Sequence, residues 1–141
     1  MNRSRSQVGQ LAASLVAIGA LFFSGSLLAQ NVGLTRTVVT KADVSTANHE
    51  AVLTKTDIAT GGSVGWHTHP GDEISYVMEG DVELSVAGRP PRTLKPGEGF
   101  VIPAGAVHAA RNAGSGNVAL SSVYYVEKGK PLATPAPTPA P

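Results

Sequence analysis

Two stretches of the chain decide its fold, GGSVGWHTHPGDEISYVMEG at residues 61–80 and GEGFVIPAGAVHAARN at residues 97–112. In the first stretch His67 and His69 are separated by one residue, so both imidazole rings leave the same face of an extended strand. The turn residues between them and Glu73 reverse the chain. Glu73 therefore begins the next strand close enough to add a carboxylate to the two rings.

The second stretch supplies one more candidate ligand, His108, at the point where a further strand is expected to begin. Three neutral imidazoles and one carboxylate form a ligand set suited to Mn, Fe, Co, Ni, Cu or Zn. In octahedral geometry these ligands leave two positions for water, oxygen or a chelating substrate. The alternative is a polar surface hairpin, which fits poorly because Trp66 and Pro70 indicate a packed setting. His49, in contrast, is expected to have no role.

The residues around these stretches are typical of an all-β protein. Short runs rich in β-branched and aromatic residues alternate with turns containing glycine and proline, which favours a sandwich or barrel. No segment of the body shows a sustained helical period. The expected strands are residues 36–41, 50–58, 74–78, 82–86, 99–102 and 117–126.

The strand expected at 74–78 is apolar on both of its faces. Alternation places Ser75 and Val77 on the face of Glu73, and the opposite face receives Ile74, Tyr76 and Met78. Because a small barrel has only one interior, the second face needs another layer. The N-terminal strand or a second subunit could supply this layer, and we expect a homodimer.

Ten positions of the two stretches resemble the two conserved motifs of the cupin superfamily. They are Gly61, His67, His69, Glu73, Gly80, Gly97, Pro103, Gly105, His108 and Asn112. The closest resemblance is to the small single-domain type 2 cupins that are often compared with quercetin dioxygenases. The resemblance implies an all-β, double-stranded β-helix (jelly-roll) barrel. It also implies one divalent transition metal bound by the residues matching His67, His69, Glu73 and His108.

Three functions are compatible with such a site. The first is an enzyme in which the metal activates dioxygen or acts as a Lewis acid on a small organic substrate. Similar dioxygenases imply that Glu73 could act as a general base. No independent acid–base residue stands out, because Tyr124 and Tyr125 lie near the end of the body with opposite facing. The alternatives are a non-catalytic module that binds or senses a small molecule, and a protein that holds metal alone.

Composition excludes several other classes. The 141 residues carry 11 basic and 10 acidic groups, and without residues 1–29 nine basic groups remain. A nearly neutral chain favours neither nucleic acid nor an anionic membrane surface. The absence of cysteine excludes disulfides, thiolate metal sites and a cysteine nucleophile.

Both ends of the chain are predicted to lie outside the folded domain. Residues 1–29 contain two arginines, an apolar run and small residues in the order of an export signal. An uncleaved anchor at 11–29 is the alternative, because this stretch could just cross a bilayer of roughly 30 Å. A cleaved signal predicts a periplasmic or secreted protein without stable membrane association. The domain is then residues 30–130, followed by a proline-rich tail at 131–141 that is expected to be disordered.

Overall fold

Nine strands account for the regular structure of residues 31–140, the part of the chain that the computed structural model describes. The same range contains no helix that could span a bilayer. The predicted export signal at 1–29 lies outside the described residues. The strands are β1 Val32–Asp43, β2 His49–Thr68, β3 Gly71–Glu79, β4 Val82–Val86, β5 Arg92–Leu94, β6 Gly99–Ile102, β7 His108–Asn112, β8 Val118–Glu127 and β9 Thr134–Pro135.

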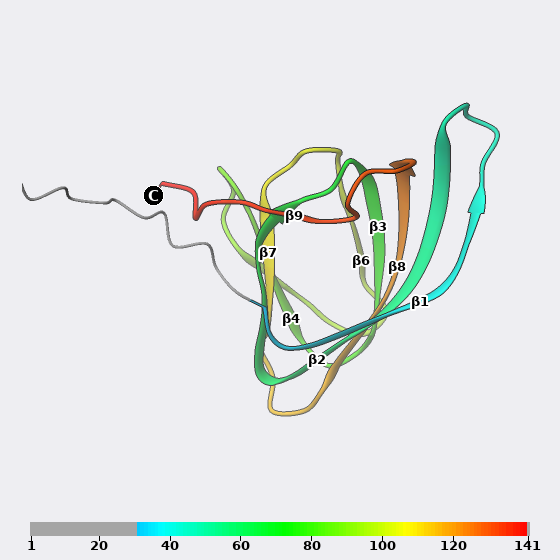
Figure 1. Ribbon diagram of the computed structural model, residues 1–141. Helices are drawn as coiled ribbons and strands as arrows, with labels where there is room; N and C mark the ends of the chain where they lie inside the picture. The colour runs from blue at the N-terminus through cyan, green and yellow to red at the C-terminus, as the bar shows by residue number, and fades with distance from the viewer. Residues whose placement is uncertain (1–30, 141) are drawn as a thin grey trace, which may run out of the picture.

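The strands form one antiparallel sheet that curls into a barrel (Figure 1). Its main path runs β5-β4-β7-β2-β8-β3-β6, and β1 and β9 both pair with β2. The 20-residue β2 is the central element, because it pairs with β1, β7, β8 and β9 in turn. This arrangement is the expected all-β, double-stranded β-helix, and the fold prediction is confirmed.

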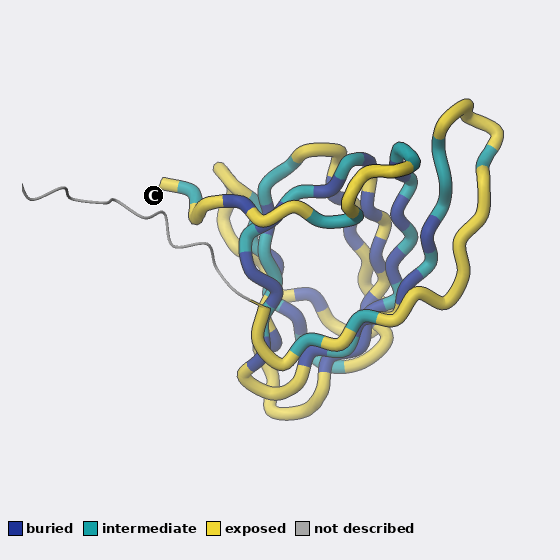
Figure 2. The backbone as a smooth tube through the Cα atoms, in the orientation of Figure 1, coloured by how far each residue is buried: buried dark blue, intermediate teal, exposed yellow. Residues whose placement is uncertain are grey.

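Buried and less buried positions alternate along the strands of the barrel (Figure 2). The buried hydrophobic side chains form two zones. The larger zone is a hydrophobic cluster from six strands, against which Leu34 of β1 packs. The smaller zone joins Val52, Tyr124 and Val126, with Leu132 of the tail packed against it. The members of the larger cluster are Ile58, Val64, Val77, Val82, Leu84, Leu94, Phe100, Ile102, Val118 and Leu120.

The strand β2 is longer than expected. Its end was predicted near residue 58, because Gly61 and Gly62 resemble a turn, but the strand continues to Thr68. Gly61 adopts a φ of 74°, and a Cβ on Gly62 would lie 2.8 Å from the carbonyl oxygens of Ala59 and Val32. These glycines therefore let the strand bend and pack closely without ending it.

The tail differs from the disorder expected for residues 131–141. Thr134 and Pro135 form β9, which pairs with the end of β2, and the Ala136 amide donates to the Trp66 carbonyl at 2.8 Å. Ala136 is buried, and Leu132 packs on the smaller interior zone. The alternating prolines did not predict these contacts, because the two apolar side chains that anchor the segment, Leu132 and Ala136, form no periodic pattern.

The two faces of β3 carry the residues expected for each, but within the described chain no further layer packs on the outer face. Ser75 and Val77 are buried, whereas Ile74 and Tyr76 are each 51% exposed. The N-terminal strand β1 pairs with β2 and so does not supply the missing layer.

Asn112 has a structural role that rests on its side chain. Gly80, Gly97 and Gly105 adopt positive φ in turns, but Asn112 does not. Its side chain instead ties the end of β7 to neighbouring segments. The amide nitrogen donates to the carbonyls of Ile58 and Gly116, and the amide oxygen accepts from the Gly114 amide.

Candidate metal centre

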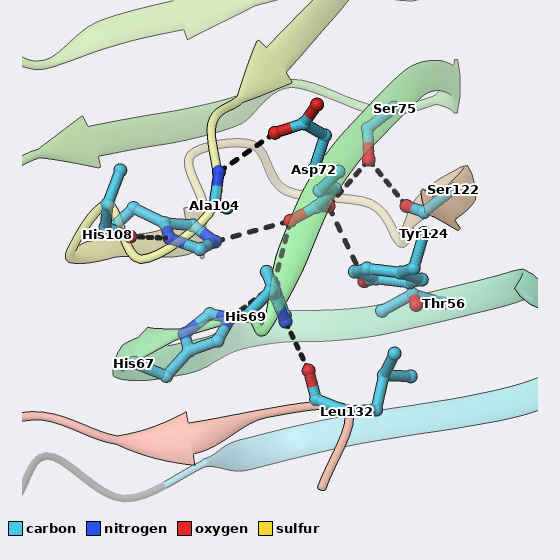
Figure 3. A network of polar contacts seen from close by, with 12 residues as sticks. Thr56, His67, His69, Asp72, Ser75, Ala104, His108, Ser122, Tyr124 and Leu132 are labelled. Atoms are coloured by element: carbon cyan, nitrogen blue, oxygen red, sulfur yellow. Dashed lines mark hydrogen bonds and ion pairs between the residues drawn. The ribbon is translucent and has the colours of Figure 1, made fainter. Parts of the chain in front are cut away.

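The four candidate ligands come together inside the barrel, as Figure 3 shows for the three histidines. His67 and His69 lie at the end of β2, Glu73 on β3 and His108 at the start of β7. The ligating nitrogens of the three rings lie within 4.8 Å of one another. The Glu73 Oε2 atom is 3.0 Å from His69 Nε2 and 3.2 Å from His108 Nε2.

Strand pairing explains this convergence. His67 and His108 are direct partners in the β2–β7 ladder, so their side chains leave the same face side by side. The chain then turns at Pro70 into β3, where Gly71 passes against the Tyr125 carbonyl of β8 too closely for any side chain. This close passage brings Glu73 beneath the rings.

Each ring is held at the nitrogen that faces away from the centre. The Nδ1–H groups donate to backbone carbonyls, at 2.7 Å from His67 to Gly65, 2.9 Å from His108 to Ala106 and 2.6 Å from His69 to Leu132. These bonds fix the tautomer, so the Nε2 atoms of the neutral rings carry the lone pairs. This is the outer hydrogen-bond pattern that orients histidine ligands of metals.

The inward-facing atoms fit a metal ion. His67 Nε2 and His69 Nε2 are 3.1 Å apart, and Glu73 Oε2 contacts both His69 Nε2 and His108 Nε2. Lone pairs at these distances repel unless protons or a cation lie between them. A divalent transition metal satisfies all four groups at once, and three imidazoles with one carboxylate suit its preferences.

Two of the candidate ligands, His67 and Glu73, have at neutral pH the protonation states that bind a metal. Burial, together with the charge that the nearby His108 can carry, lowers the pKa of His67 to about 4. Burial alone would raise the pKa of Glu73, but in the metal-free protein the Ser75 hydroxyl, and the His108 and His69 rings when they carry a proton at Nε2, donate to the carboxylate and lower its pKa. The protein therefore presents a neutral His67 and an ionised Glu73, which are the ligating forms.

Tyr124 belongs to the site although the sequence analysis did not select it. Its hydroxyl lies 3.5 Å from Glu73 Oε1, and its ring packs edge-on against His69 with centroids 4.7 Å apart. Burial, together with the charge of Glu73, raises the pKa of Tyr124 to about 12. Alternation along β8 makes Tyr124 the inward residue of its pair with Tyr125, but the sequence did not show that this end of β8 reaches the site.

A small cavity of about 20 Å³ adjoins the centre. Its wall includes His67, Glu73, His108 and Tyr124, and Arg36 of β1 also lines it. A much larger hollow of about 780 Å³ is lined by residues of β3, β4, β6 and β8 and by the segment at residues 89–92. None of the four candidate ligands lines it, so the candidate centre adjoins the smaller space.

Sequence comparison identifies the family. Residues 54–131, more than half of the chain, match the cupin domain. The dimethylsulfoniopropionate lyase DddQ of Ruegeria pomeroyi is 41% identical over 46 residues, which cover 33% of this chain and 23% of the lyase. A germin-like protein of Arabidopsis thaliana, subfamily 2 member 2, is 38% identical over 77 residues, 51% of this chain and 35% of that protein. The chain thus spans about a third or less of these relatives.

Solved structures show the same fold. A cupin-like protein from Thermotoga maritima has a TM-score of 0.64 at 20% identity, with 83% of this chain and 89% of that chain covered. A double-stranded β-helix protein from Klebsiella pneumoniae has a TM-score of 0.62 at 22% identity, with 80% and 92% covered. The barrel, its buried histidines and the match over residues 54–131 together make this chain a member of the cupin family.

Proposed function

We propose that this protein is a metal-dependent enzyme that binds one divalent transition metal through His67, His69, Glu73 and His108. The observation that carries the proposal is the orientation of the three rings. Each Nδ1–H is tied to a carbonyl, so every Nε2 atom faces the centre beside the Glu73 carboxylate. Mn, Fe, Co, Ni, Cu and Zn all suit this donor set.

The interior also provides groups that can move a proton. A bound metal would supply Lewis-acid polarisation of a substrate oxygen. Glu73 Oε1 accepts a hydrogen bond from Ser75 Oγ at 2.6 Å and lies 3.5 Å from the Tyr124 hydroxyl. We propose Glu73 as the general base. Tyr124, which is protonated at neutral pH, is then the general acid that donates a proton back or stabilises the protonated Glu73 by a hydrogen bond.

A direct test of the centre is metal content. Alanine at any of the four proposed ligands should reduce bound metal, measured by elemental analysis after loading and desalting. His49→Ala is the matched control, because His49 lies outside the centre and bonds to the Ala47 carbonyl. Full stoichiometry in all four ligand variants would refute the proposal.

Activity should be sought first as bond cleavage by proton removal, because one relative is named as a lyase. The substrate tested is dimethylsulfoniopropionate, with release of dimethyl sulfide followed by gas chromatography. Tyr124→Phe should lower turnover roughly 10²–10⁴-fold while metal content stays unchanged. Oxygen uptake with catechols, flavonols and diketones would instead favour the type 2, quercetin-dioxygenase-like assignment.

The small cavity supports a second candidate, a non-catalytic module that binds or senses a small molecule. A volume of about 20 Å³ holds little more than one water molecule, so an organic substrate requires side chains to move. Tight ligand binding without turnover by the metal-loaded protein would favour this second candidate over the enzyme.

We further propose that the protein is exported to the periplasm or beyond and is not stably bound to a membrane. The support is the signal-like order of residues 1–29 alone. Fractionation of cells that produce the full chain, with N-terminal sequencing of the mature protein, tests this proposal. Retention of residues 1–29 in the membrane fraction would contradict it.

A further inference from the structure

Arg36 reaches the metal-site cavity from a strand that otherwise faces outward. Within β1 only Leu34 and Arg36 are partly buried, and they are two residues apart on one face. Leu34 packs against the apolar cluster, whereas Arg36 lines the same cavity as His67, Glu73 and His108. The second inward position of β1 therefore delivers a guanidinium group to the candidate centre.

This guanidinium has no carboxylate partner among residues 31–140. It makes a long hydrogen bond of 3.4 Å from Nε to Thr56 Oγ1, and it lies over the Tyr124 ring, whose centroid is 5.8 Å from Cζ. Within the same range six other basic side chains form ion pairs. These are Lys41, Lys55, Lys95, Arg111, Lys128 and Lys130.

Glu73 cannot serve as that partner. It is the only acidic residue that lines the cavity, and its two oxygens are occupied by His69, His108 and Ser75. With a divalent cation in place, the cation, one carboxylate and Arg36 would leave the cavity with a surplus of positive charge. A partly buried, positively charged wall of this kind favours an anionic ligand.

We infer that Arg36 is the anion-recognition residue of this site and that the ligand is a small carboxylate with a short apolar body. A guanidinium fork matches a carboxylate through two parallel hydrogen bonds. Beside Arg36 the wall offers the hydroxyls of Thr56 and Tyr124, which lie near each other in Figure 3, and the apolar side chains of Phe100 and Leu120. The inference rests on the proposed function in that it names the substrate class of the same centre.

Entry of the ligand requires Arg36 to move. A carboxylate group is larger than the present cavity of about 20 Å³. The long bond to Thr56 is a weak restraint, so the half-buried side chain can swing aside and then close on the ligand. Arg36 thus recognises the carboxylate and covers the cavity.

The test uses propionate as the probe and propionamide as its uncharged analogue, with zinc-loaded protein. Binding is measured by calorimetry, and the Nε–H resonance of Arg36 is followed by NMR. Propionate should shift this resonance to saturation, and propionamide should not. Arg36→Gln should weaken propionate binding roughly tenfold to a hundredfold, with zinc content unchanged, and Arg36→Lys should weaken it less.

Arg89→Gln is the matched control, because Arg89 is exposed and lines the separate outer hollow. It should bind propionate like the unaltered protein. Equal binding of propionamide, or unchanged propionate affinity in Arg36→Gln, would overturn the inference. If the protein takes up none of Mn, Fe, Co, Ni, Cu and Zn, the proposed function fails, and the same titration on metal-free protein then decides the inference by whether propionate shifts the Arg36 resonance.

Discussion

Each of the three histidines in the centre donates a hydrogen bond to a backbone carbonyl, but the sequence separation between ring and carbonyl differs. His67 and His108 donate to carbonyls two residues before them, so their own strands orient their rings. His69 donates to Leu132, 63 residues further along. Two rings are therefore oriented locally, whereas the third depends on tertiary structure.

His67 should make the metal-free protein sensitive to acid. In the unfolded chain a histidine protonates near pH 6.5, whereas burial holds the pKa of folded His67 at about 4. Between these values the unfolded state binds a proton that the folded state does not, so unfolding free energy falls by up to about 3 kcal/mol as pH drops from 6.5 to 4. Urea unfolding of chelator-treated protein across this range measures the slope.

The control for this pH dependence is His67→Gln, which should lose the slope, beside His49→Gln, which should keep it. Glu73 contributes in a lower pH window. Its folded pKa lies below its usual value of 4.5, so the stability that it adds above pH 4.5 is lost as the pH falls further. An unchanged slope in His67→Gln would contradict this assignment.

Among the elements, β3, β4 and β6 were predictable because alternation, β-branched residues and turn glycines all agree within each of them. The short β5 and β9 were not, because three residues and two residues carry too little pattern. The ligands were predictable from spacing, since a period of two fixes which side chains share a face. Arg36 and Tyr124 were not, because their place in the cavity depends on how β1 and β8 cross the barrel.

The tail segment Leu132–Ala136 should contribute to metal affinity. Removing residues 131–141 deletes the carbonyl that accepts from His69, so zinc should bind roughly tenfold to a hundredfold more weakly, measured by competition with a chromophoric chelator. Removing only residues 137–141 keeps Leu132, β9 and the buried Ala136, and affinity should be retained. Equal affinities for the two truncated proteins would show that the tail has no such role.

The passage of β3 beside β8 should tolerate only glycine at residue 71. In Gly71→Ala the new Cβ would overlap the Tyr125 carbonyl oxygen, so the two strands must separate. The expected loss is at least about 3 kcal/mol in unfolding free energy, measured by chemical denaturation. Gly116→Ala is the control, since a Cβ there meets open space. A loss below 1 kcal/mol in Gly71→Ala would contradict the close passage.

At the scale of the whole molecule, one face of the barrel remains apolar and open within the described chain. Ile74 and Tyr76 are each 51% exposed, and Val101 of the adjacent β6 is 61% exposed. A contiguous apolar surface on a small protein is typical of an interface. This face, whose residues also line the hollow of about 780 Å³, supports the homodimer expected from the sequence, which we propose here.

Sedimentation velocity at micromolar concentration should therefore show a dimer. Tyr76→Glu places a charge at the centre of the face and should shift the protein to monomer. Val32→Glu changes an equally exposed valine at the start of β1 and should leave the dimer intact. A monomer for the unaltered protein would contradict the homodimer.

The bond between His69 and Leu132 also sets an order of events during biosynthesis. The three histidines are all translated before the carbonyl that steadies one of them. A chain that has been synthesised only as far as β7 still lacks the Leu132 carbonyl, so the His69 ring has no such partner. If the centre binds a metal, as proposed, tight binding would therefore have to wait until the C-terminal segment pairs with the end of β2.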